Sequence, residues 1–171
     1  AEGVSLYSAF AVLYSFQLRN LLKGIGQQMK WSVRDESLHS KMGCQLFRQM
    51  CSQIPGLKEE CEPHIFEAAL TMHNAEMTYI SKMFEAGDIE NLTQYDLKHF
   101  IKKRLGDKLA ELGYTSKKYK QWDFTFYDPK CIENMSWFDH LTGGHTHTDF
   151  FAIRPTDYSK ANEGEDFEDI W

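Results

Sequence analysis

The chain has 171 residues, of which 42% are hydrophobic and 14% aromatic, and its formal net charge is −6. This length and composition predict one domain with a substantial core. The acidic segment, residues 157–171, holds six acids and one base, a net charge of −5, which leaves −1 of the total for residues 1–156. A near-neutral remainder offers no basic face of the kind that nucleic acid requires.

The chain opens with an uncharged stretch, residues 3–18. Its 16 residues are too few to span a bilayer, and no basic region precedes them as in a signal peptide. We therefore expect a core helix from about residue 2 to Leu22, apolar on nearly all sides. Lys23, followed by Gly24 and Gly26, predicts its end.

Three more long helices follow. The second is expected from about Gln27 to Ile54, before Pro55 and Gly56, and the third from Leu57 to about Phe84. The third helix should bury one apolar stripe, made of Cys61, Ile65, Ala68, Met72, Tyr79 and Met83. Long helices joined by short turns favour antiparallel neighbours in an all-α bundle.

The fourth helix has recognisable signals at both ends. Thr93 is the expected N-cap and Gly113 the residue after the C-cap. Its expected apolar side consists of Leu97, Ile101, Leu105, Leu109 and Leu112. Beyond Tyr114 the pattern predicts an irregular, aromatic-rich segment with a short helix near residues 135–141. We expect a domain over residues 1–155 and a polar, acidic tail over residues 156–171.

The four cysteines, Cys44, Cys51, Cys61 and Cys131, have neither a CxxC spacing nor the density of a disulfide-stapled scaffold. This usage is typical of reduced, buried thiols in a cytoplasmic protein.

Glu36 and His39 lie in the middle of the second helix, three residues apart, so both side chains leave the same face. That face is otherwise mostly apolar and contains Met29, Val33, Ser40, Gly43, Phe47, Met50 and Ile54. A bare buried carboxylate is costly unless it is paired or bound to metal. Glu-x-x-His on one helix face is the half-site of carboxylate-bridged dimetal bundles, although a lone pair of this spacing also occurs by chance.

Other candidate pairs favour structural explanations. His73 and Glu76 have the reverse order and predict a hydrogen-bonding pair, with Glu76 on the buried side of the third helix. Glu60 and His64 predict a surface pair, and His145 and His147 fall in a Gly/Thr-rich loop.

Two segments give the chain a family resemblance. "EGVSLYSAFA" and "RDESLH", whose glutamates Glu2 and Glu36 are 34 residues apart, resemble the small, radical-generating subunit of class I ribonucleotide reductase. "TDFFAIRPTDYSKA" is similar to the stretch that leads into that family's C-terminal tail. The resemblance covers nearly the whole chain and implies a ferritin-like helical bundle.

The resemblance also implies roles for individual residues. Glu2, Glu36 and His39 would ligate one metal of a di-iron site, with manganese as an alternative, and Glu36 would bridge to the second metal. Asp35 matches an aspartate that connects a metal-bound histidine to the radical path, and Tyr158 a tyrosine that relays the radical to the large subunit. Leu6 and Phe10 match positions that line an apolar pocket near the metals; the first is usually Phe.

Three of the roughly six protein ligands that such a bundle needs are present. The family's first aspartate ligand, its first ExxH, its radical tyrosine and the tryptophan of the transfer path precede the matched region. We therefore expect this chain to resemble the C-terminal half only, either as one piece of a split small subunit or as a fragment. We expect an N-terminal partner chain to complete the bundle, and the completed subunits to form a dimer that binds neither nucleic acid nor membrane.

Three functions compete at this point. The first is a ribonucleotide reductase component, inactive without its N-terminal complement and the large subunit. The second is another ferritin-like dimetal oxidase, which Tyr158 and the acidic segment argue against. The third is a helical interaction module with a vestigial site. For the first, Phe167, Ile170 and Trp171 are expected to dock in a groove of the large subunit as one face of a short helix.

Overall fold

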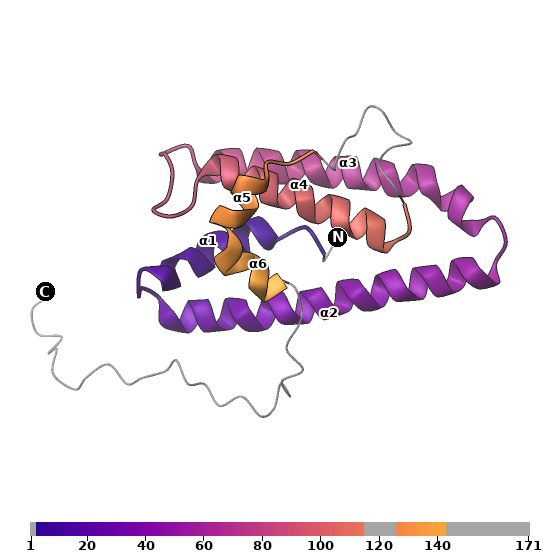
Figure 1. Cartoon of the computed structure of the whole chain (residues 1–171), viewed down its shortest axis with the longest axis horizontal. Coiled ribbons are helices and arrows are strands. Elements are labelled where there is room, and N and C mark those ends of the chain that lie inside the picture. Colours follow the sequence, from indigo (N-terminus) through magenta and orange to yellow (C-terminus); the bar gives the residue numbers. More distant parts are fainter. Residues whose placement is uncertain (1–2, 115–125, 143–171) are drawn as a thin grey trace, which may run out of the picture.

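The computed structural model describes residues 3–114 and 126–142. These residues form six helices and no extended strand, apart from an isolated bridge between Ile89 and Leu92 (Figure 1). The all-α class is therefore confirmed. The helices are α1 (Tyr7–Leu18), α2 (Lys23–Gln53), α3 (Leu57–Met83), α4 (Gln94–Glu111), α5 (Pro129–Asn134) and α6 (Ser136–Thr142).

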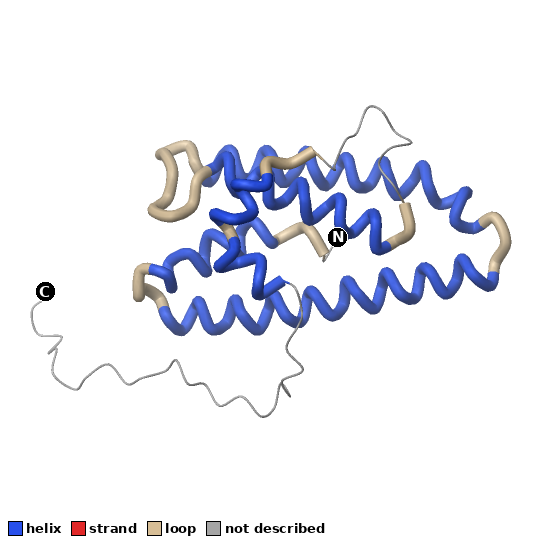
Figure 2. Tube along the Cα trace, in the orientation of Figure 1, coloured by secondary structure: helices blue, strands red, loops and turns tan. Residues whose placement is uncertain are grey.

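The long helices lie roughly along one direction. Helix α1 packs against both α2 and α4, and α3 packs along α4. The short α5 and α6 run from α4 across to α2. The α1–α2 turn and the α3–α4 loop lie at one end of the molecule, and the α2–α3 turn lies at the other (Figure 2).

Aromatic rings occupy the centre of the core. Tyr7, Phe100 and Phe138 are fully buried, and their ring centroids lie 6.5 Å apart for Tyr7–Phe138 and 5.6 Å apart for Phe100–Phe138. These rings join α1, α4 and α6. The predicted apolar side of α4 is confirmed for Leu97, Ile101, Leu105 and Leu109, which are all buried. The fifth member, Leu112, is the C-cap residue and is partly buried.

The predicted caps of α4 are also confirmed. The Asp96 amide donates to Thr93 Oγ1 at 3.0 Å, and Thr93 Oγ1 donates to Asp96 Oδ2 at 2.7 Å. Gly113 has φ +89°, the left-handed conformation that favours glycine after a helix. Helix α2 ends at the expected place, with Ile54 extended before Pro55.

The predicted boundary between the first two helices is wrong. Helix α1 begins at Tyr7 rather than near residue 2, and it ends in a Schellman motif around Asn20, whose φ is +62°. In that motif Leu21 N–H donates to Phe16 O and Asn20 N–H to Gln17 O, both at 3.0 Å. Lys23 opens α2 instead of closing α1.

The two glycines after Lys23 therefore belong to α2. Gly26 is buried, and a Cβ there would collide with the Gln17 side chain. This glycine serves close packing of α1 on α2 and does not end a helix, which explains the error.

The buried face of helix α3 is rotated by one residue relative to the predicted face. Phe66, Ala69, Glu76 and Ile80 are buried, whereas Ala68 is exposed and Tyr79 is 46% exposed. One residue corresponds to a rotation of about 100°. The larger Phe66 and Ile80 side chains take the core positions, and the predicted stripe lies at the edge of that face.

All four cysteines are free thiols. Cys44 and Cys131 are buried as expected, and Cys51 and Cys61 are partly exposed. Within the described residues, every helix is too short or too polar to cross a membrane.

Candidate metal centre

Glu36 and His39 come together on the middle of α2. Glu36 Oε2 lies 3.9 Å from His39 Nδ1, and Asp35 Oδ1 lies 3.5 Å from His39 Nε2. The imidazole thus sits between two carboxylates of its own helix, each facing a different ring nitrogen. A histidine that binds metal through one nitrogen commonly donates its other N–H to a carboxylate, and this arrangement has that form.

Glu36 carries a buried oxygen that the protein leaves unsatisfied. Its Oε2 is buried and has no hydrogen-bond partner among the described residues. Buried polar atoms are nearly always hydrogen-bonded, so an orphaned acceptor requires an explanation. A cation bound beside Glu36 and His39 supplies one, because carboxylate oxygen and imidazole nitrogen are ligands for iron, manganese and zinc. These two residues fit a metal.

The stripe around these residues is less buried than predicted. The side chain of Glu36 is 24% exposed, that of His39 48% and that of Asp35 60%. Met50 and Ile54, expected on the buried face, are 42% and 48% exposed. The reason is that α1 covers α2 near Val33, which is fully buried, whereas the later turns of α2 have few neighbours within the described chain.

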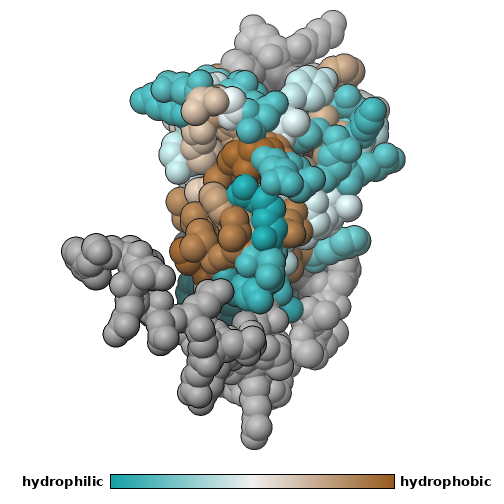
Figure 3. Space-filling model, turned by 90° about the vertical axis from the view of Figure 1, so that its left-hand side faces the viewer, coloured by the Kyte–Doolittle hydropathy of each residue, from teal (hydrophilic) through white to brown (hydrophobic). Residues whose placement is uncertain are grey.

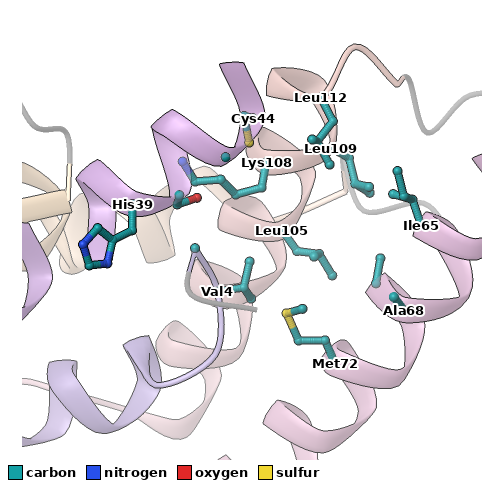
Figure 4. A pocket seen from close by; sticks show the side chains of 14 residues that line it. Val4, His39, Cys44, Ile65, Ala68, Met72, Leu105, Lys108, Leu109 and Leu112 are labelled. Atoms are coloured by element: carbon teal, nitrogen blue, oxygen red, sulfur yellow. The ribbon is translucent and has the colours of Figure 1, made fainter. Parts of the chain in front are cut away.

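An apolar groove runs from His39 into the space between α2, α3 and α4 (Figure 4). Its volume is about 420 Å³. Val4 of the N-terminal segment and Met72 of α3 line its floor, and Lys108 of α4 lies on the His39 side. Leu6 is not among the lining residues: it is 53% exposed, with φ +77°. Phe10 packs instead on the Tyr7 ring, 5.8 Å between centroids.

Gly3 brings the N-terminal segment close to the candidate centre. A Cβ on Gly3 would collide with Ser40 Oγ, one residue after His39, and would lie 3.1 Å from the Lys108 side chain. Only a residue without a side chain allows this approach. The expected ligand Glu2, the neighbour of Gly3 in the sequence, lies outside the described residues.

The described residues supply only part of a metal site. Within residues 3–114 and 126–142, no three His, Cys, Asp or Glu side chains come together as a metal-binding group. Tyr158, Phe167, Ile170 and Trp171 lie outside these ranges, as do His145 and His147.

In the alternative pair on α3, His73 and Glu76, the glutamate forms a hydrogen bond inside the protein. Glu76 is buried, and its Oε2 accepts a hydrogen bond from the buried Ser8 Oγ at 2.6 Å. Burial of Glu76 was predicted, but its partner Ser8 on α1 was not. Glu60 and His64 are both exposed, as expected of a surface pair.

A polar cluster beside Glu36 was not predicted. Tyr7 Oη lies 3.3 Å from Val33 O and 2.8 Å from Ser37 Oγ, so α1 is tied to α2 next to Glu36. The Arg104 guanidinium lies 3.4 Å from the centroid of the Tyr7 ring. Burial raises the pKa of Tyr7 and lowers the pKa of Arg104. The sequence signal was the presence of Tyr7 and Ser8 in a helix that is uncharged and mostly apolar.

The family model and the similar proteins found by comparison all indicate the same protein family. The family model described as "Ribonucleotide reductase, small chain" matches residues 1–121. A probable ribonucleoside-diphosphate reductase small subunit of Invertebrate iridescent virus 3 is 29% identical over 94% of this chain and 41% of its own length. The corresponding protein of Invertebrate iridescent virus 6 is 26% identical over 99% of this chain and 51% of its own length.

A bacterial relative matches a shorter region. The ribonucleoside-diphosphate reductase subunit beta of Chlamydia pneumoniae is 36% identical over 69 residues, which is 40% of this chain and 18% of that protein. The chain thus spans about half the length, or less, of these curated relatives.

Proposed function

The chain belongs to the family of ribonucleotide reductase small chains, and from that premise we propose that it supplies the C-terminal half of such a subunit. Its helices form a ferritin-like helical bundle, the fold of this family. In the proposed function the chain contributes half of a carboxylate-bridged dimetal site, and the large subunit reduces ribonucleotides to deoxyribonucleotides. We place this reaction in the cytoplasm.

In the proposed function Glu2, Glu36 and His39 would hold the metal. The observation that carries this proposal is the buried Glu36 Oε2, which has no hydrogen-bond partner in the described part of the chain and lies 3.9 Å from His39 Nδ1. Gly3, the neighbour of Glu2 in the sequence, supports a role for Glu2, because the Gly3 backbone lies close to Ser40 of α2. Iron is the proposed metal, and the same ligands also accept manganese.

Each residue around the site has a defined task. When bound, the metal pair supplies oxidative chemistry with O₂ that amino-acid side chains lack. Asp35, 3.5 Å from His39 Nε2, orients the imidazole so that Nδ1 faces the same side as Glu36. The apolar groove excludes water from the neighbourhood of these ligands. Tyr158 would pass an electron and a proton between this chain and the large subunit.

Two partners follow from the proposal. An N-terminal half must bring the remaining ligands, since the described residues hold no complete metal-binding group and a dimetal bundle needs about six protein ligands. The large subunit is the second partner, and Phe167, Ile170 and Trp171 are the proposed anchors for it. Completed small subunits would pair as a dimer.

Metal analysis tests the proposal directly. The purified chain should bind iron poorly alone, and two irons per complex after addition of a polypeptide that carries the N-terminal region of a relative. Zinc and manganese are measured in the same samples. Tight binding of two irons by this chain alone would refute the idea that it holds half a site.

A further inference from the structure

The α1–α2 turn exposes a group of large apolar side chains. Leu18, Leu21, Leu22 and Ile25 are 44%, 49%, 51% and 39% exposed. The view onto this end of the molecule shows apolar surface on either side of a strip of hydrophilic residues (Figure 3). Single exposed apolar residues are ordinary, but three leucines and one isoleucine within eight residues form a surface that favours contact with another apolar group.

Leu22 is also held in an unfavourable backbone conformation. Its φ and ψ are +48° and +43°, in the left-handed region that side chains other than glycine and asparagine seldom adopt. The side chain gains little from burial in return, since it is half exposed. The turn therefore presents a leucine to the outside at a cost to local stability.

The sequence on both sides of this turn carries basic and no acidic residues. Residues 3–34 contain four bases, Arg19, Lys23, Lys30 and Arg34, and no acid. Lys23 is exposed at the start of α2. Arg19 stacks on the Phe16 ring at 4.6 Å, and its Nε is buried without a hydrogen-bond partner among the described residues. The α3–α4 loop at the same end holds the acids Glu85, Asp88 and Glu90, so an acidic ligand would be directed to the α1–α2 turn.

The acidic segment of this chain has the complementary chemistry. It carries a net charge of −5 and the apolar residues Phe167, Ile170 and Trp171. The last described residue, Thr142, is attached near α2, with its carbonyl oxygen 3.4 Å from Ser37 Oγ. Ser37 and Lys23 are 14 residues apart on one helix, about 21 Å. The 14 residues 143–156 can span about 46 Å when extended, so residue 157 can reach the turn.

We propose that residues 157–171 dock on the α1–α2 turn of their own chain when no large subunit is bound. Phe167, Ile170 and Trp171 cover the exposed leucines, and the carboxylates face Lys23 and Arg19. Because the two parts belong to one chain, contact needs no second molecule, and a tether of this length typically supplies an effective concentration near the millimolar range. The proposal does not depend on metal binding.

Zero-length cross-linking of the full chain tests this docking. A carbodiimide joins a lysine to a carboxylate only when the two are in contact, and trypsin then releases residues 161–171 attached to the lysine-containing peptide. Lys41 is the internal control, because it is also exposed on α2 and lies only four residues from Ser37, nearer to the tether than Lys23. Docking predicts that links to Lys23 exceed links to Lys41 by about fivefold or more.

Variants separate the apolar contact from simple charge attraction. Leu21→Ser should lower the Lys23 links about threefold or more, since burial of a leucine is lost, whereas the control Leu46→Ser, on an α2 leucine that is 59% exposed, should leave them unchanged. Circular dichroism confirms that both variants are folded. A mixture of ¹⁵N-labelled and unlabelled chains shows whether links form within one chain. Links that favour Lys41, that resist Leu21→Ser or that join two different chains would each overturn the proposal.

Discussion

Replacing Glu36 by methionine should stabilise the metal-free chain while it abolishes the candidate metal centre. Glu36 Oε2 is buried and has no hydrogen-bond partner among the described residues, so the folded protein gains no hydrogen bond from this atom there when no cation is present. Methionine has a similar length and no polar atom that needs a partner. Stability and metal binding should therefore change in opposite directions at this residue.

The size of the effect follows from the exposure of the side chain. An unsatisfied buried acceptor typically costs about 1–3 kcal/mol. Because 24% of the Glu36 side chain remains exposed, we take the lower end of that range. Glu36→Met should then raise the free energy of unfolding by about 1 kcal/mol, which corresponds to about 2–4 °C in melting temperature for a protein of this size.

Glu76 provides the matched control, since it is a buried glutamate three residues from a histidine. Its Oε2 accepts a 2.6 Å hydrogen bond from Ser8. Glu76→Met removes that bond and leaves the buried Ser8 hydroxyl without its acceptor, so it should lower the free energy of unfolding by about 2 kcal/mol.

Urea unfolding in the presence of EDTA measures both changes. The two glutamates should give opposite signs with unchanged m-values. If Glu36→Met lowers the free energy of unfolding by as much as Glu76→Met does, Glu36 belongs to a structural network, and the assignment of its orphaned oxygen to a metal is wrong.

Four further outcomes are expected. Once the N-terminal complement is present, Glu36→Ala should abolish binding of two metals and His73→Ala should not, as metal analysis will show. Tyr158→Phe should leave metal content intact and stop nucleotide reduction, because phenylalanine keeps the ring but has no hydroxyl proton; normal turnover would exclude it from the radical path. A peptide covering the acidic segment should compete with the chain for the large subunit, and its Trp171→Ala version should bind about thirtyfold more weakly, for an anchor worth about 2 kcal/mol; equal competition by both peptides would contradict the docking assignment. Burial raises the pKa of the Cys131 thiol from 9.0 to about 12, so the stability that the neutral thiol contributes is complete below about pH 9 and is lost as the pH approaches 12. Cys131→Ala should therefore reduce the fall in melting temperature between these pH values. An unchanged fall in melting temperature would contradict burial as the cause of the pKa shift.

Helix ends were predictable where the deciding chemistry is local. Thr93 caps α4 through a bond to an amide three residues ahead, and Ile54 stops α2 because Pro55 follows it. The end of α1 was missed because Asn20 takes the left-handed position, while the more conspicuous Gly26 is needed for contact with Gln17. A glycine required for packing cannot be told from one required for a turn without the neighbouring helix.

The buried contacts of the site were harder to predict than its residues. Spacing placed Glu36 and His39 on one face of α2 and placed Glu76 on the buried side of α3. It gave no sign that Ser8 would donate to Glu76, 68 residues away, or that Arg104 would stack on Tyr7. Pairing of polar groups between helices depends on how those helices are rotated about their axes, and the predicted rotation of α3 was wrong by one residue.

The apolar face predicted for α2 is more exposed in the structure than the sequence pattern indicates. The pattern around Glu36 predicts a buried face that extends to Met50 and Ile54, yet these residues are 42% and 48% exposed. Leu46 is 59% exposed on the same half of the helix. Helix α2 therefore has more apolar surface than the described helices cover. Apolar surface of this extent favours a protein contact, and an N-terminal half that brought the missing ligands to Glu36 and His39 would pack against this part of α2.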